Sequence, residues 1–145
     1  MKKRRALLLY PHQLFQELPK ALKLEANEPI FLLEDPLFFY DAQYPARFHI
    51  QRLLFHRVSM QRWAATLTDQ GYTVHHLKYQ GPEYSALYDH LQEALTTAKV
   101  TQLCVPELSD DILTRRLSRR ITAWVKAQNG PLDCAIEWCV DILPS

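Results

Sequence analysis

The sequence predicts an α/β fold: a doubly wound parallel sheet of five strands with helices on both faces. Strand-like apolar runs alternate with helical patterns through the whole chain, and this alternation is typical of βαβ units. The length of 145 residues and the hydrophobic content of 48% allow one full core and are too small for two ordinary domains. We therefore expect residues 1–145 to form a single domain.

The elements follow from local patterns. An apolar run predicts the first strand and stops at Pro11, and the second strand ends in a Glu-Asp-Pro turn. The long second helix repeats apolar residues close to the helical period, and Gly71 follows it in the usual left-handed terminating position. Asp110 and Asp111 complement the dipole of the fourth helix at its first turn. The predicted strands are residues 6–10, 30–34, 73–79, 101–105 and 133–140, and the predicted helices are residues 14–22, 48–70, 83–97 and 110–128.

Right-handed crossovers arrange these strands most simply in the order 3-2-1-4-5, a Rossmann-like or flavodoxin-like sheet. In such sheets a ligand lies beyond the carboxyl ends of the strands, near the point where the strand order reverses. The rule selects residues 10–13, 34–36 and 106–109. None of the three glycines forms a dinucleotide fingerprint or a phosphate loop, so a ligand here would be held by side chains and aromatic contacts.

A dense aromatic segment follows the second strand. Exposed aromatic residues on a loop usually indicate a ligand or domain interface, and the alternative is a loop folded onto the core. The members of this aromatic loop are Phe38, Phe39, Tyr40, Tyr44 and Phe48.

Basic residues and histidines allow functional and structural interpretations. Four arginines form one face of the fourth helix; they could meet phosphate or an acidic partner, although a solvated face is the more typical role. His49 and His56 share a face of the second helix without cysteine or carboxylate ligands at metal spacing, so we predict no metal site. No nucleophile or opposed carboxylate pair stands out, so we predict no catalytic residues in this chain. The four arginines are Arg115, Arg116, Arg119 and Arg120.

The cysteine content indicates the cellular compartment, and the net charge indicates which partners the protein attracts. The three cysteines are odd in number, lack a C-x-x-C spacing and fall in apolar runs, which predicts buried thiols in a reducing cytoplasm. No apolar stretch approaches a membrane span of about 20 residues. The net charge of +1 gives no global attraction to nucleic acid or membrane.

Residues 33–67 resemble the N-terminal region of the deoxyribodipyrimidine photolyase-related branch of the photolyase/cryptochrome superfamily. There too a strand ends in an acidic residue, here Glu34, and a loop rich in Phe and Tyr follows. The helix then opens with a His-x-Gln-Arg/Lys pattern and continues with an Ala/Ser-Met-x-x-Phe/Trp segment. These positions are His49, Gln51, Arg52, Ser59, Met60 and Trp63.

The resemblance implies an antenna domain of the bacterial iron–sulfur branch. Such a domain binds a ribityllumazine, while FAD and an iron–sulfur cluster belong to a C-terminal helical domain that this chain lacks. The chain would then be a cytoplasmic fragment of a flavoprotein that acts in light-driven DNA repair or blue-light sensing, meeting DNA only in the full-length protein. Glu34 would hydrogen-bond the ring, Tyr40 would stack on it, and His49 and Gln51 would line the pocket. The implied chromophore-binding residues are Pro11, His12, Gln13, Leu14, Glu34, Tyr40, His49 and Gln51.

Two other functions stay open on the residues alone. The first is a stand-alone small-molecule- or nucleotide-binding α/β module, which the missing glycine-rich loop disfavours. The second is a protein-interaction module that uses the aromatic loop and the arginine face of the fourth helix.

Overall fold

A parallel sheet forms the centre of the domain. The computed structural model describes residues 5–11, 23–25, 27–44, 50–100, 102–105, 110–126 and 137–138. All strand pairs are parallel, in the order β3-β2-β1-β4-β5. The strands are β1 (Arg5–Leu9), β2 (Ile30–Leu33), β3 (Val74–Leu77), β4 (Gln102–Val105) and β5 (Glu137–Trp138).

The order 3-2-1-4 of the four longer strands agrees with the prediction. Of the predicted fifth strand, residues 133–140, the structure describes Glu137 and Trp138, which pair with β4. The other residues of that predicted strand lie outside the described residues. Among the described residues the sheet thus has four strands of four or five residues, and the predicted fifth is represented by Glu137 and Trp138 alone.

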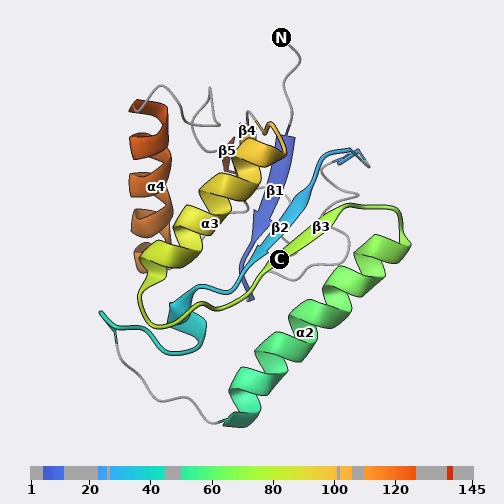
Figure 1. The fold of residues 1–145 in the computed structure, drawn as a ribbon. Coiled ribbons are helices and arrows are strands. Elements are labelled where there is room, and N and C mark those ends of the chain that lie inside the picture. The colour runs from blue at the N-terminus through green and yellow to red at the C-terminus, as the bar shows by residue number, and fades with distance from the viewer. Residues whose placement is uncertain are drawn as a thin grey trace.

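Helices cover both faces of the sheet (Figure 1). The helix α2 packs on one face, and α3 and α4 pack on the other. The helices are α2 (Ile50–Asp69), α3 (Tyr84–Thr97) and α4 (Asp111–Lys126), together with the short 3-10 helix η2 (Pro36–Phe38). The predicted helix at residues 14–22 lies outside the described residues.

Successive side chains of a strand point to opposite faces of the sheet. The sheet therefore separates two apolar cores. In β1, Leu8 belongs to the core beneath α3 and α4, and Leu7 and Leu9 belong to the core beneath α2. All three leucines are fully buried. Burying one such side chain stabilises a fold by roughly 1.5–3 kcal/mol, so the central strand holds both helical layers in place.

The helix α2 is buried only in its C-terminal half. Met60, Trp63 and Leu67 pack on the sheet. The apolar repeat of the predicted helix at residues 48–70 includes Leu54 and Val58, and such a repeat predicts one buried face, but both side chains are exposed. The expectation was wrong there because the N-terminal half of α2 extends past the carboxyl ends of the strands, where no sheet lies beneath it (Figure 1).

The end of α2 follows the predicted pattern. Gly71 has φ +95°, a left-handed conformation that glycine adopts without steric cost. The amide of Tyr72 donates to the carbonyl of Leu67 at 3.0 Å, which closes the last turn.

Cys104 is buried in β4 and disulfide-bonded, with its second sulfur outside the described residues. The prediction that it is a free thiol is therefore wrong, and the cysteines give no argument for a reducing compartment. Among the described helices, none is both long and apolar enough to cross a membrane.

Candidate functional site

Two adjacent carboxylates follow β2 at the carboxyl rim of the sheet, and they face opposite sides. Glu34 points toward α2, whereas Asp35 points toward α3 and α4. Both side chains are fully buried. We call their surroundings the Glu34 cluster (Glu34, Arg57, His76 and Tyr79) and the Asp35 cluster (Asp35, Asp41, Tyr10, Tyr88 and Arg116).

In the Glu34 cluster, both carboxylate oxygens are fully used. Arg57 donates from Nε to Oε2 and from Nη2 to Oε1, both at 2.7 Å. His76 Nε2 lies 2.8 Å from Oε2, and the amide of Tyr79 donates to Oε1 at 2.8 Å. A carboxylate offers about four lone-pair sites, so Glu34 holds a fixed set of partners and has no unused acceptor.

The hydrogen bonds outweigh the cost of burial at Glu34. Burial raises the pKa of its carboxyl, but hydrogen bonds from His76, Arg57 and the Tyr79 amide bring it below its ordinary value. The Glu34 carboxyl is therefore ionised in the folded protein at neutral pH.

The outer surface of the Glu34 cluster is only partly covered. The Arg57 side chain remains 34% exposed, and its guanidinium carbon lies 5.7 Å from the ring centroid of Phe39. That ring stacks on Tyr79 at 5.3 Å, and the Tyr79 hydroxyl donates to the carbonyl of Tyr40. Tyr40 itself is 49% exposed. Cationic and aromatic groups thus meet solvent together at this part of the rim.

A partly buried imidazole lies beside this surface. His56 contacts the edges of Phe38 and Phe39, with ring centroids 5.8 and 6.2 Å away. Its Nε2 atom is buried without a hydrogen-bond partner among the described residues. Burial and the nearby charge of Arg52 lower the pKa of His56, so the ring is neutral near pH 7.

The Asp35 cluster is a chain of buried hydrogen bonds. The Tyr88 hydroxyl donates to Asp35 Oδ2 at 2.7 Å and lies 2.9 Å from the Tyr10 hydroxyl. Arg116 Nη1 donates to Asp35 Oδ1 at 2.7 Å, and the Leu37 amide donates to the same oxygen. The chain connects β1, β2, α3 and α4, so it ties together the layers on one side of the sheet.

Arg116 is the cation of this cluster. Its side chain is only 4% exposed, and its Nη2 lies 2.8 Å from Asp41 Oδ1 as an ion pair that is not aligned as a hydrogen bond. Burial lowers the pKa of Arg116, but Asp35 and Asp41 raise it above its ordinary value. Burial raises the pKa of Asp35, against opposing hydrogen bonds from Leu37 and Tyr88 and the charge of Arg116. The ion pair at 2.7 Å nevertheless indicates an ionised Asp35 at neutral pH.

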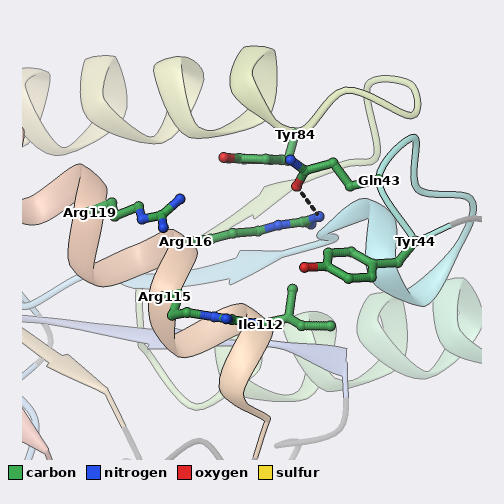
Figure 2. Close-up of a pocket in the computed structure, with 7 residues that line it drawn as sticks. All are labelled: Gln43, Tyr44, Tyr84, Ile112, Arg115, Arg116 and Arg119. Carbon is green, nitrogen blue, oxygen red and sulfur yellow. Dashed lines mark hydrogen bonds between the residues drawn. The ribbon is translucent and has the colours of Figure 1, made fainter.

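A pocket of about 90 Å³ adjoins the Asp35 cluster (Figure 2). Its walls come from the aromatic loop, the first turn of α3 and one face of α4. The lining residues are Gln43, Tyr44, Tyr84, Ile112, Arg115, Arg116 and Arg119.

Two of the predicted chromophore-binding residues lie together on the Glu34 side. Glu34 and Tyr40 are linked there through Tyr79. Pro11 is buried directly after β1, and Gln51 is exposed on the first turn of α2. The remaining predicted residues, His12, Gln13, Leu14 and His49, lie outside the described residues.

The predicted site residues did not include Arg57, His76 or Tyr79. Only the strand period contained a signal: neighbouring residues of a strand point to opposite faces, and His75 and His76 do so. His75 stacks on Phe31 at 4.9 Å, whereas His76 contacts Glu34. The register that pairs Leu33 with Leu77 places His76 beside the end of β2.

Part of the aromatic loop is folded onto the core, and part of it is exposed as an interface would be. Phe39 is buried and Phe38 packs against the core beneath α3 and α4. Tyr40 and Tyr44 are 49% and 44% exposed. Phe48 lies outside the described residues. Within the part of the chain that the structure describes, no group of three or more His, Cys, Asp or Glu side chains could hold a metal ion.

Comparison with known proteins places this geometry in a family context. The family model described as deoxyribodipyrimidine photo-lyase-related protein matches residues 7–138. The uncharacterized protein R852 of Acanthamoeba polyphaga mimivirus is 28% identical over 86 residues. That alignment covers 59% of this chain and 43% of the viral protein, so the chain spans less than half of this relative's length.

Proposed function

Because this chain belongs to the deoxyribodipyrimidine photo-lyase-related family, we propose that it is the antenna-chromophore-binding domain of a photolyase-related flavoprotein. In this proposal a ribityllumazine binds at the carboxyl rim on the Glu34 side. The bound chromophore would absorb light and pass the excitation energy to a flavin held by another domain. The chain itself supplies binding and orientation.

The observation that carries the proposal is the half-covered surface of the Glu34 cluster. It combines a fixed cation, Arg57, with Tyr40, an aromatic ring that is half exposed. Ligand sites of this kind join apolar and aromatic walls to a few oriented polar groups. The rim position also agrees with the ligand position expected for a doubly wound sheet.

Glu34 acts in this proposal by positioning its neighbours. Its oxygens are saturated by Arg57, His76 and the Tyr79 amide, so a direct hydrogen bond to a ligand would require losing one of them. Arg57 and His76 are the groups that would meet a carbonyl or ring nitrogen of the chromophore.

His56 is the proposed polar contact for a flat heteroaromatic ring. Its Nε2 is buried without a partner among the described residues, and the edges of Phe38 and Phe39 surround it. Contact between this nitrogen and the ring of a ligand would require the side chains around it to move. We propose that the ring lies between Tyr40 and the N-terminal half of α2, with Gln51 and His49 at the helix start and residues 11–14 completing the pocket.

The exposed side of α2 is the proposed contact for the flavin-binding partner domain. Phe55 is 69% exposed, and three further apolar residues of the same half-helix are exposed beside it. Apolar groups gathered this way mark interaction surfaces more often than solvated ones. They are Ile50, Leu54 and Val58. FAD, an iron–sulfur cluster, DNA contact and any repair or light-sensing activity would belong to that partner domain, in the cytoplasm.

A fluorescence titration tests the proposal. The protein is titrated with 6,7-dimethyl-8-ribityllumazine, and anisotropy reports immobilisation of the ring. Wild-type protein is expected to give saturable binding, and Tyr40→Ala is expected to weaken it at least tenfold because a stacked aromatic pair is lost.

Tyr44→Ala is the matched control. Tyr44 has a similar exposure and lies in the same loop, but it contacts Arg116 on the other side of the rim. This variant is expected to bind like the wild type. Absence of saturable binding to the wild type, or equal losses in both variants, would refute the proposed site.

A further inference from the structure

The pocket beside the Asp35 cluster has a chemistry of its own. It lies on the face of the sheet covered by α3 and α4, away from the Glu34 cluster, and it has no part in the proposed chromophore site. Three of its seven lining residues are arginines, and none is acidic. The arginines follow one another on one face of α4, at positions 115, 116 and 119.

The three guanidinium groups have different roles. Arg116 is buried, with Asp35 and Asp41 at its outer nitrogens. Arg115 and Arg119 are exposed, and neither has an ion pair or hydrogen bond among the described residues. Their neighbour Arg120 differs, since it pairs with Asp89 at the outside of α3. The pocket therefore joins one fixed cation to two whose donors are unused.

The arrangement around Arg116 leaves one buried donor without an acceptor. Its Nε atom has no hydrogen-bond partner among the described residues, although the side chain is only 4% exposed. The guanidinium carbon lies 4.2 Å from the ring centroid of Tyr84 and 5.8 Å from that of Tyr44. These rings and the two carboxylates hold the group in one orientation. A buried N–H without an acceptor is costly unless water or a ligand supplies one.

We infer that this pocket binds a phosphate group. The side chains of Arg115 and Arg119 project beside Arg116, and the hydroxyl groups of Tyr44 and Tyr84 point toward the arginines (Figure 2). Arginine forks bind phosphate oxygens through paired charge-assisted hydrogen bonds, and separate forks can bind separate oxygens. The pocket volume of about 90 Å³ leaves room for a phosphate group beside the arginines.

The phosphate could belong to a small phosphomonoester or to a nucleic-acid backbone. In both cases the pocket would hold the phosphate alone, and the rest of the molecule would lie outside it. The shared chemistry is a tetrahedral dianion or monoanion at the three arginines. Salt weakens such contacts, so binding is expected to fall as ionic strength rises.

Calorimetric titration with inorganic phosphate at constant ionic strength tests the pocket. Wild-type protein is expected to bind one phosphate, and the double variant R115Q/R119Q is expected to bind at least tenfold more weakly. Arg116 stays unchanged in this test because the fold depends on it. The matched control is R62Q/K78Q, which also removes two positive charges, but from exposed residues outside the pocket.

Three further titrations identify the source of the phosphate and separate this site from the chromophore site. Tighter binding of adenosine monophosphate than of phosphate assigns a phosphomonoester, and tighter binding of an oligonucleotide without terminal phosphates assigns a nucleic-acid backbone. R115Q/R119Q is expected to bind ribityllumazine like the wild type, whatever the outcome for the chromophore. No saturable phosphate binding by the wild type, or equal losses in R115Q/R119Q and R62Q/K78Q, would overturn the inference.

Discussion

Glu34 and Asp35 are neighbours in the chain, yet they build opposite kinds of environment. The Asp35 cluster is closed: Tyr10, Tyr88 and Arg116 are almost fully buried, and hydrogen bonds link the Tyr10–Tyr88 pair and Arg116 through Asp35. The Glu34 cluster is half open, since its arginine remains 34% exposed. The difference arises from the helices, because α3 and α4 pack over the rim on one side and α2 extends past it on the other.

The end of β2 therefore contributes both to the stability of the fold and to the proposed ligand site. A buried ion pair with several hydrogen bonds fixes the layers on the Asp35 side. That rigidity holds the end of β2 in place, so the carboxylate one residue earlier keeps its own partners in fixed positions. The proposed binding on the open side would then need little reorganisation.

Removing the cation of the closed side is expected to have the largest effect. Arg116→Ala leaves Asp35 and Asp41 buried without their counter-ion, which costs about 3–5 kcal/mol of unfolding free energy. Urea unfolding measures the loss. Arg120→Ala is the control, because its partner Asp89 is largely exposed and such pairs contribute about 0–1 kcal/mol. Equal losses would mean that the Asp35 cluster is not the more rigid side.

Loss of the Tyr88 hydroxyl on the closed side is expected to have the second-largest effect on stability. Tyr88→Phe removes the donor to Asp35 and the partner of Tyr10, at a cost of about 1–3 kcal/mol. Thermal unfolding measures the change. Tyr84→Phe, on the same helix, removes a hydroxyl with no hydrogen bond among the described residues and is expected to have little effect. A larger loss for Tyr84→Phe would contradict the hydrogen-bonded chain.

Arg57→Ala is expected to destabilise the protein less than Arg116→Ala. Glu34 keeps the contacts with His76 and the Tyr79 amide, and solvent can reach the space left by the partly exposed arginine. We expect a loss of about 1–2 kcal/mol in urea unfolding, the range for one charged hydrogen-bonding group at a partly exposed site. A loss as large as that of Arg116→Ala would remove the distinction between an open and a closed side.

The pH dependence gives the smallest and most specific comparison. The pKa of Glu34 is lowered in the fold from its ordinary value of 4.5, so its stabilisation is present above pH 4.5 and is lost as pH falls through the folded value. The pKa of Asp35 is raised, so protonation of Asp35 at low pH favours the fold instead. The difference in unfolding free energy between wild type and Glu34→Gln should therefore shrink on acidification below pH 4.5. A difference that stays constant from pH 7 to pH 3 would contradict the assignment.

Much of the fold could be predicted because it depends on local patterns. Apolar runs such as residues 6–10 and 30–34 mark strands wherever they occur, and right-handed crossovers then leave few possible strand orders. The exposure of Leu54 and Val58 could not be predicted in this way. Helical periodicity shows which residues share a face, but not how far the sheet extends beneath that face.

The position of the candidate site at the rim followed from the sequence, but several of the residues that form it did not. Topology and family resemblance both selected the rim at Glu34, but Arg57 and His76 come from other elements 23 and 42 residues away. Which side chains meet across elements depends on packing that one sequence does not display. The arginine face of α4 likewise divides in the structure between buried Arg116, Arg120 paired with Asp89, and the two exposed pocket arginines.

A crystal structure of the protein soaked with 6,7-dimethyl-8-ribityllumazine tests the central claim most directly. We predict electron density for the ring against Tyr40 on the Glu34 side of the rim, with Arg57 or His76 within hydrogen-bonding distance. Density for the chromophore in the arginine pocket beside Tyr44, or no density at saturating concentration, would contradict the assignment of binding to the open side.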